Sequence, residues 1–588
     1  METTEQIDKY SQSGAKVLPR SALILGALLF TAVVARFYVA FRYEVNWDEF
    51  YYLSFVHQLI NGEAINSFQT FHIHFFTWLQ HVSSNEVDQI IAARLVMIVF
   101  QLGTGLCIYK LCRLQCSVSG ALFAVLAYFA FSFNVRMGAS FRTDPIATFL
   151  VMISLFYVFR DQLTWRASVV CGVLTAVALL ITLKTSLYIP TFLMTVLVCF
   201  YWTQDRVGYA KQILIYGCSI LVSFAILYSW HYFTISSLSS GADAGSMLSA
   251  ADKTMNQREF FPRWFYFQHS LVTDFGYWIA LLLSIAFAVF SCFNQVQINR
   301  TASLKLLSLL LLLGTLLLYR NAFPYYYAFM LAPVCVLFAV AWDGTQHYLS
   351  DKASRFFSII IPSLFAVSIV VNGFIFPTKS TLDYQRSFIE EIHKIFPQPV
   401  AYIDRCSMIS SYSKQGFFMS TWGYEDYQAR GTPVIQSAIE NANPVFVVAN
   451  THYLDVLGVN VLNVNQSKED EHSGSESKDW LLEQDSEALK SNYIHHWQDL
   501  FVAGKVLHFT QEDELQVIQI HIEGEYTLEG EIDILLDGQI WKSDQVRYLS
   551  KGSYQVSSAS AGEVVMRWGD HLYRPENVSQ SKALFTGF

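Results

Sequence analysis

Residues 21–53 read SALILGALLFTAVVARFYVAFRYEVNWDEFYYL, and this stretch decides the fold class. Residues 21–41 are apolar over a length that suits one bilayer-spanning helix. Two adjacent carboxylates, Asp48 and Glu49, follow directly in an aromatic setting. An acidic pair beside a membrane-length segment is either the start of a solvated helix or part of a catalytic site.

The composition of the whole chain extends this membrane assignment. Of 588 residues, 53% are hydrophobic and only 15% are charged, whereas soluble domains carry about 25% charged residues. The net charge is -9, which excludes the basic surface that is typical of nucleic-acid-binding proteins.

Further apolar runs of similar length follow the first. Against the roughly 20 residues that a spanning helix needs, we expect about eleven spans, of which 145–159 is short: 21–41, 90–110, 117–134, 145–159, 167–184, 188–202, 212–233, 274–293, 303–319, 325–342 and 356–376. The first run is longer than the core of a signal peptide, so we interpret it as a retained anchor.

Lysine and arginine residues near the ends of the spans predict the orientation. With the N-terminus and its Lys9, Lys16 and Arg20 inside, every other inside loop is also basic. An odd number of spans then places everything after residue 376 outside. The basic residues that break this rule invite a functional explanation: Arg36, Arg42, Arg136, Arg142, Lys184, Lys253, Arg258, Arg263 and Arg320.

Four regions are predicted along the chain. Residues 1–376 form the transmembrane domain, with interfacial helices in the aromatic loop 42–89. Residues 377–464 predict an extracytoplasmic α/β segment, because PVAYID and PVFVVAN read as buried strands around a helical VIQSAIENA. Residues 465–482 form a polar linker, and residues 483–588 alternate between apolar and polar side chains as a β-sandwich does.

The positions of the cysteines favour a periplasmic location for the C-terminal part. Of nine cysteines, only Cys406 lies after Cys335. A domain with one cysteine has no internal disulfide and depends on its own core. We therefore expect a multi-pass protein of a bacterial inner membrane, with a periplasmic active site and C-terminal domain.

The predicted topology collects polar residues on the outer side of the membrane. They follow the first span, join the third and fourth, end the fifth, and precede the tenth. Because polar groups near the membrane core are costly, such a one-sided set indicates a site. Its members are Asp48, Glu49, His72, His74, His81, Arg136, Arg142, Asp144, Lys184 and Arg320.

The chemistry of this set suits transfer of a sugar from a lipid phosphate. A carboxylate can accept a proton from an acceptor. Arginine, lysine or histidine can hold a phosphate and stabilise its charge as it leaves. Interfacial helices lined with aromatic side chains can admit the long lipid.

Four motifs carry a resemblance to a known superfamily. They are NWDEFYYL after the first span, SFRTDPIATFL opening the fourth, LKTSLYIP ending the fifth, and YRNAFPYYYAFMLAP entering the tenth. In this order they resemble the GT-C superfamily of integral-membrane glycosyltransferases, in particular the protein O-mannosyltransferase and aminoarabinose transferase (ArnT-like) clan. The resemblance covers roughly residues 20–376 and the general plan of a C-terminal domain on the active-site face.

The resemblance implies an inverting transfer of a monosaccharide from undecaprenyl or dolichyl phosphate to a glycan, lipid or protein acceptor. Asp48 would be the catalytic base, Glu49 would orient the acceptor or bind metal, and Asp144 would orient the site. Candidates for the donor phosphate are Arg142, Lys184 and Arg320. Tyr325 and Tyr326 would line the lipid or sugar pocket.

The chain departs from its relatives in the first loop. FQTFHIHFFTWL contains no lysine or arginine where relatives often have a basic residue, so His72 or His74 would substitute. A neutral histidine holds a phosphate less strongly than a cation does. Metal use stays open, with Asp48, Glu49 and His74 as candidate ligands.

Each of these residues also has a purely structural interpretation. Asp48 and Glu49 could begin a helix, and Asp144 before Pro145 could be an N-cap. Lys184 could extend to the interface, Arg320 could be an ordinary flanking charge, and the histidines could be packed. Alternative functions are a transporter or flippase of lipid-linked glycan, and a noncatalytic membrane scaffold.

Overall fold

A computed structural model describes residues 20–63, 65–160, 163–235, 260–294, 300–458, 480–512, 514–576 and 583–587. Lys9, Lys16, Lys253, Arg258 and residues 465–479 of the predicted linker lie outside these ranges. The chain forms two compact units. The helical unit comprises Met1–Phe41, Asn66–His72 and Arg94–Thr378, and the sheet unit comprises Arg42–Ile65, Ile73–Ala93 and Lys379–Phe588. The predicted domain limits stay predictions.

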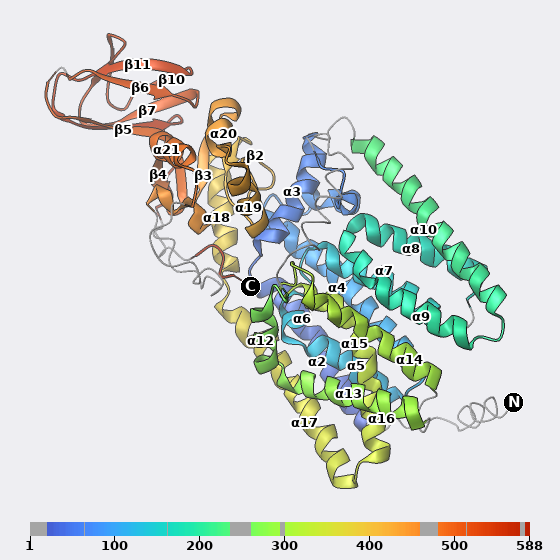
Figure 1. Cartoon of the computed structure of the whole chain (residues 1–588). Helices are drawn as coiled ribbons and strands as arrows, with labels where there is room; N and C mark the ends of the chain where they lie inside the picture. Colours follow the sequence, from blue (N-terminus) through green and yellow to red (C-terminus); the bar gives the residue numbers. More distant parts are fainter. Residues whose placement is uncertain are drawn as a thin grey trace. The chain divides into compact units, whose positions relative to one another are not determined.

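Helices long and apolar enough to cross a membrane account for most of the predicted spans (Figure 1). Among the described residues there are eight: Arg20–Arg42 (α2), Glu86–Cys112 (α4), Leu183–Trp202 (η3 and α9), Arg206–Ile235 (α10), Phe275–Asn294 (α13), Arg300–Leu317 (α14 and η4), Tyr326–Tyr348 (α15, η5 and α16) and Asp351–Ile395 (α17, η6, η7 and α18). The chain is a multi-pass membrane protein.

The other three predicted spans coincide with shorter apolar helices. They are Val118–Ala130 (α5), Thr143–Phe159 (α7) and Trp165–Ile181 (α8). With 13, 17 and 17 residues, they are shorter than a helix of about 20 residues that crosses a bilayer alone. Each of the eleven predicted spans therefore coincides with a helix, and eight of these helices are long enough to cross a membrane.

The helical unit has its core around Tyr326–Tyr348, which is almost entirely buried. A helix that is apolar on all sides belongs in the centre of a bundle. Its partner α5 approaches closely at Gly120, where a side chain would meet the Ala339 carbonyl at 3.0 Å. Two short helices, Ser132–Met137 (α6) and Trp264–Thr273 (α12), complete the described part of this unit.

The sheet unit has its own helices, most of them short. They are Trp47–Asn61 (α3), Phe71–Phe75 (η1, shared with the helical unit), Thr77–His81 (η2), Leu382–Ile395 (α18), Thr421–Arg430 (α19), Val434–Ala442 (α20), His452–Leu457 (η8) and Glu483–Asn492 (α21). The predicted helix VIQSAIENA is confirmed as α20. The predicted helices of the first loop are confirmed as α3, η1 and η2.

One large sheet runs through most of this unit, in the strand order β10-β7-β12-β5-β3-β1-β2, with β4 also paired to β5. The strands are Tyr402–Ile403 (β1), Lys414–Gln415 (β2), Phe446–Val448 (β3), Tyr493–Trp497 (β4), Leu500–Phe509 (β5), Gly524–Gly530 (β7), Val546–Leu549 (β10) and Gly562–Trp568 (β12). β1 pairs with β2 and β3 in parallel, whereas β3 pairs with β5 antiparallel. The predicted α/β strands and the predicted β-rich strands thus share one sheet.

A second sheet has the order β6-β11-β8-β9 and lies beside the other strands in Figure 1. It contains Gln516–Ile520 (β6), Ile534–Leu536 (β8), Gln539–Trp541 (β9) and Gly552–Ser557 (β11). Residues of both sheets, including Leu528, Trp541, Val556 and Met566, form one buried core. The predicted sheet region at the C-terminus is confirmed, and its two sheets share this core.

Candidate functional site

The acidic pair lies at the start of α3, in the sheet unit. Asn46 is the N-cap, and its side chain accepts the Asp48 backbone N–H at 3.0 Å. The buried Glu49 carboxylate accepts the Asn46 backbone N–H at 3.1 Å, which completes a capping box. The interpretation of the pair as a helix start is confirmed. Because the cap uses the backbone of Asp48, its half-buried carboxylate is not required for the cap.

The residues before the cap are fixed by distant parts of the sheet unit. Gln385 of α18 forms two hydrogen bonds of 2.8 Å with the Val45 backbone. The buried Glu44 carboxylate accepts hydrogen bonds from Thr381 and from Thr586 near the C-terminus. Burial raises the pKa of Glu44, although these hydrogen bonds oppose the shift. The position of Asp48 therefore depends on residues after 379.

Aromatic contacts extend this support along the first turns of α3. Trp47 and Phe50 both make edge contacts with Phe585, with ring centroids at 5.9 and 6.1 Å. Tyr51 stacks on Phe418 with centroids 4.0 Å apart and an interplanar angle of 5°. Each contact joins α3 to a residue far along the chain.

A cation that the sequence interpretation missed lies beside the acidic pair. The Arg405 guanidinium carbon lies 3.8 Å from the centroid of the Trp47 ring. Burial lowers the pKa of Arg405, and the Asp48 carboxylate is among the groups that oppose this shift. No sequence signal could have found this pair, because Trp47 and Arg405 are far apart in the chain.

The loop after β1 holds Arg405 in place. The Asp404 carboxylate accepts backbone N–H groups from Cys406, Ser407 and Met408 at 2.8 to 3.2 Å. The Asn450 side chain donates to Asp404 at 3.2 Å and accepts the Arg405 backbone N–H at 2.9 Å. The side-chain oxygens of Asp404 are thus occupied in fixing the loop.

A second polar cluster lies in the helical unit, around Asp144. Its carboxylate pairs with Lys184 Nζ at 2.8 Å and with Arg142 Nε at 3.4 Å. All three side chains are largely buried, with 4, 12 and 5% of the side-chain surface exposed for Asp144, Lys184 and Arg142. The cluster thus presents an arginine and a lysine, the two side chains that most often bind phosphate oxygens.

The predicted N-cap role of Asp144 is wrong. Helix α7 begins at Thr143 with Arg142 as its N-cap residue, so Asp144 lies within the first turn. A residue there can point its carboxylate away from the helix end, and Asp144 uses its side chain for the ion pairs.

Tyr325 joins this cluster, whereas Tyr326 packs elsewhere. The Arg142 guanidinium carbon lies 3.4 Å from the Tyr325 ring centroid, and Lys184 Nζ lies 4.8 Å from it. Tyr326 is fully buried, and its hydroxyl bonds Thr315 at 2.6 Å. Among these residues, the structure brings Arg142, Asp144, Lys184 and Tyr325 together.

Arg320 lies in the loop before α15, where its carbonyl accepts a hydrogen bond of 3.1 Å from Arg263 Nε. The Arg263 guanidinium also lies 4.2 Å above the Phe323 ring. Arg263, one of the outside basic residues, is thus held by protein groups.

The two histidines fall in different units. His72 is buried in the helical unit, and His74 is half-buried in the sheet unit, where burial lowers its pKa. Within the described residues, no group of three or more His, Cys, Asp or Glu side chains is placed to hold a metal ion. The described cysteines are all free thiols.

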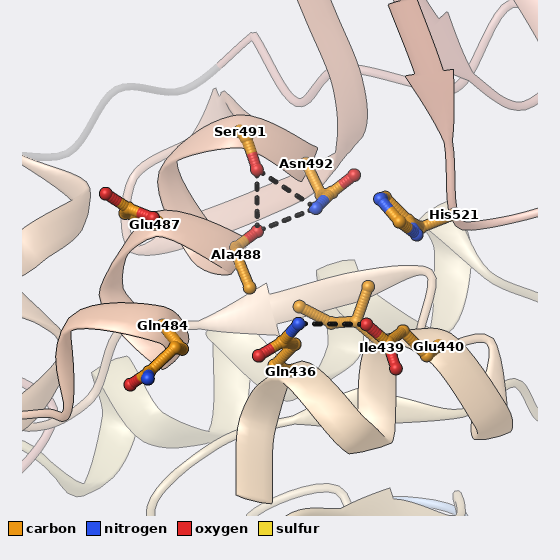
Figure 2. A pocket seen from close by; sticks show the side chains of 9 residues that line it. All are labelled: Gln436, Ile439, Glu440, Gln484, Glu487, Ala488, Ser491, Asn492 and His521. Atoms are coloured by element: carbon orange, nitrogen blue, oxygen red, sulfur yellow. Dashed lines mark hydrogen bonds between the residues drawn. The ribbon is translucent and has the colours of Figure 1, made fainter. Parts of the chain in front are cut away.

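Two further pockets are lined by other residues. Figure 2 shows one of about 210 Å³ in the sheet unit, between α20 and α21, lined by Gln436, Glu440, Glu487, Asn492 and His521 among others. The other, of about 480 Å³ in the helical unit, is lined by Ser117, Asp343, His347 and Arg355 among others. Neither contains a predicted site residue.

Comparison with solved structures identifies the fold. ArnT from Cupriavidus metallidurans bound to undecaprenyl phosphate matches with a TM-score of 0.51 and 13% identity, over 72% of this chain and 92% of that one. The oligosaccharyltransferase AglB from Archaeoglobus fulgidus matches with a TM-score of 0.47 and 11% identity, over 90% and 94%. The arabinosyltransferase EmbB from Mycobacterium smegmatis matches with a TM-score of 0.39 and 10% identity, over 95% and 66%. No family model and no curated protein matches this sequence. The chain has the fold of the GT-C superfamily.

Proposed function

We propose that this protein is a glycosyltransferase that moves a sugar from a polyprenyl-phosphate donor to an acceptor at the extracytoplasmic face of the membrane. The observation that carries the proposal is Asp48, a half-buried carboxylate on the first turn of α3, shortly after the first membrane-length helix of a GT-C fold. Fold alone does not give a reaction, so the proposal depends on the chemistry of the residues.

In the proposed reaction, an acceptor oxygen attacks the anomeric carbon of the sugar. The bond between that carbon and the phosphate oxygen breaks, and the electron pair leaves with the phosphate. Asp48 accepts the proton of the acceptor as general base. Attack opposite the leaving group inverts the anomeric centre.

We assign the donor phosphate to the Asp144 cluster of the helical unit. Arg142 offers a planar fork of donors that suits phosphate oxygens, and Lys184 adds a point charge. Asp144 orients both cations through its ion pairs. Arg320 is a further candidate for the phosphate, and Tyr325 lies against both cations of the cluster.

Glu49 has a supporting role in this proposal. Its carboxylate is buried and holds the Asn46 N–H, so it orients the helix start that carries Asp48. The protein is proposed to act in a bacterial inner membrane, with the active site and sheet unit in the periplasm. His72 and His74 are kept as weaker candidates for the substrate.

Substitution of Asp48 tests the proposal. The purified full chain would be supplied with a polyprenyl-phosphate-sugar extract from its host, and mass spectrometry would follow the appearance of free polyprenyl phosphate. We expect Asp48→Asn to lower turnover by roughly 100-fold or more, as loss of a general base does. The polyprenyl-phosphate lipid should still co-purify with the variant. Asp383→Asn, at an exposed aspartate of the same unit, is the matched control.

Three results would contradict the proposal. Unchanged turnover in Asp48→Asn would remove Asp48 as base. Transport of an intact lipid-linked sugar across proteoliposomes, with no release of polyprenyl phosphate, would support the transporter alternative. A chain that neither transfers nor transports would support the scaffold alternative.

A further inference from the structure

The environment of Arg405 differs from that of an ordinary surface arginine. Its guanidinium carbon lies over the Trp47 ring, and an arginine in such a contact can still use its N–H donors for hydrogen bonds. Its Nε is buried, and among the described residues no acceptor bonds it. A buried donor left without a partner is destabilising, so an anion that accepts this N–H would stabilise the arrangement.

The nearest carboxylate in the sequence is already occupied. Asp404 bonds the loop backbone and Asn450, so its oxygens hold the loop. Lys414, from β2, donates to the Phe417 carbonyl at 2.7 Å and adds to the positive charge here. Burial lowers the pKa of Lys414, and Asp404 opposes that shift.

A cluster of half-buried rings lies beside Arg405. Tyr424 stacks on Tyr453 with centroids 4.6 Å apart and an interplanar angle of 11°. His452 contacts both Tyr453 and Trp480, at 4.1 and 4.8 Å. Asn450, which bonds the Arg405 backbone, directly precedes this segment. We call Tyr424, His452, Tyr453 and Trp480 the aromatic cluster.

The charge of Arg405 acts on His452 of the aromatic cluster. The pKa of His452 is lowered to about 4, first by burial and second by the Arg405 charge. His452 is therefore neutral near pH 7 and leaves Arg405 as the charged group. Flat aromatic faces beside a cation suit a sugar ring that carries an acidic substituent.

The direction of the proposed transfer decides which substrate this site serves, because Asp48 takes its proton from the acceptor and not from the donor. The Arg405 guanidinium lies over Trp47, which directly precedes Asp48. A cation beside the proposed base is therefore placed for the acceptor.

We propose that the acceptor is an acidic glycan, whose phosphate or carboxylate is bound by Arg405 and whose sugar ring packs on the aromatic cluster. This inference rests on the proposed function for the direction of transfer. Bidentate binding of an oxyanion by arginine is a charge-assisted interaction, worth roughly 1.5–3 kcal/mol. That range corresponds to roughly 10- to 150-fold in affinity.

Binding measurements on the full chain in detergent test the inference without any turnover. The probes are an oligoglucuronide, a phosphorylated oligomannoside and a neutral oligosaccharide of equal length, followed by saturation-transfer NMR. We expect the wild type to bind at least one acidic probe 10-fold or more tighter than the neutral one. The better of the two acidic probes then identifies the anion as carboxylate or phosphate.

Variants assign the preference to Arg405. We expect Arg405→Met to remove the preference while neutral binding stays unchanged, and Arg405→Lys to keep part of it. Arg386→Met is the matched control, because Arg386 pairs with Asp88 and Asp383 at the surface of the same unit. If Arg405→Met does not fold, Arg405→Lys tests the inference alone: its ratio of acidic-probe affinity to neutral-probe affinity must be lower than that of the wild type.

Three outcomes would overturn the inference. Equal affinity of the wild type for acidic and neutral probes would exclude an anion site. If Arg405→Met kept the wild-type ratio of acidic-probe to neutral-probe affinity, Arg405 would only pack on Trp47. An unchanged ratio in folded Arg405→Lys would exclude bidentate binding. Asp48→Asn should keep the acid preference, so a failure of the proposed base is distinguished from a failure of this site.

Discussion

The Gln385 side chain and the Val45 backbone bond each other twice. Val45 N–H donates to Gln385 Oε1, and Gln385 Nε2 donates to the Val45 carbonyl, each at 2.8 Å. Gln385 also donates to the Leu584 carbonyl at 2.7 Å. One buried glutamine thereby joins α18, the chain end and the segment that leads into α3.

Replacement of Gln385 should loosen the start of α3. Gln385→Leu leaves the Val45 N–H and carbonyl buried without partners, each at a cost of about 1–3 kcal/mol. We expect a lower unfolding temperature and reduced transfer, measured by tryptophan fluorescence in detergent and by the release of polyprenyl phosphate. Gln484→Leu, at an exposed position of α21, should change neither. Wild-type stability in Gln385→Leu would contradict the structural role.

The capping box predicts a smaller effect at Asn46. Asn46→Ala removes the acceptor of the Asp48 N–H and should cost about 1 kcal/mol. Asn46→Asp keeps an acceptor oxygen there and should retain wild-type stability. We expect transfer to fall in the alanine variant and recover in the aspartate variant, because the cap orients the helix that carries Asp48. Equal activity of both variants would show that the N-cap does not affect transfer.

The ion-pair cluster around Asp144 should respond as a unit. Asp144→Asn leaves Arg142 and Lys184 buried without their carboxylate, and loss of one partner of a buried pair costs about 3–5 kcal/mol. The double variant Asp144→Asn/Lys184→Met also removes one of the two cations that faced the carboxylate and should recover part of that stability. Thermal unfolding of the single and double variants measures the coupling. Additive losses would show that the two side chains act independently.

Asp499 predicts a pH dependence of the stability of the sheet unit. Burial raises the pKa of Asp499 to about 7 from 3.8. Because the folded state keeps the proton over this range and the unfolded state loses it, Asp499 favours unfolding increasingly as the pH rises from about 4 to 7. Full deprotonation would cost about 4 kcal/mol, at 1.36 kcal/mol for each pKa unit.

Asp499→Asn removes the pH-dependent contribution of Asp499 to the free energy of unfolding. We expect the variant to gain stability over the wild type as the pH rises from 4 to 7, and to match it near pH 4. His496, whose pKa burial lowers to about 4, gives the opposite slope over nearly the same range, so the difference between the variant and the wild type is the quantity to measure. A pH-independent difference would contradict the shift at Asp499.

Local patterns predicted many elements correctly. The eleven apolar runs, the helix α20 and the β-rich tail follow from residue type and spacing alone. Asp537 and Gly538 both adopt positive φ, at 50° and 76°, in the turn between β8 and β9. This is the two-residue hairpin turn that an Asp-Gly pair favours.

Other features could not be predicted because they depend on long-range contacts. The pairing of β3 with β5 joins two segments that composition separates, since a backbone edge pairs by geometry and not by residue type. Arg405 was missed as a candidate for the same reason. Its neighbour Trp47 is brought to it by packing, and no local signal marks a contact of this kind.

The sequence by itself determined that this is a multi-pass membrane protein, and it identified the acidic pair and the Asp144 group as candidates. These properties follow from hydrophobic length and from the cost of placing charge near lipid, which act locally along the chain. Only the tertiary structure decided that Arg142, Lys184 and Tyr325 gather around Asp144, and that Gln385 and Arg405 flank the start of α3. Hydrogen bonds and ion pairs act over a few ångströms, so their partners are set by the fold and not by the order of residues.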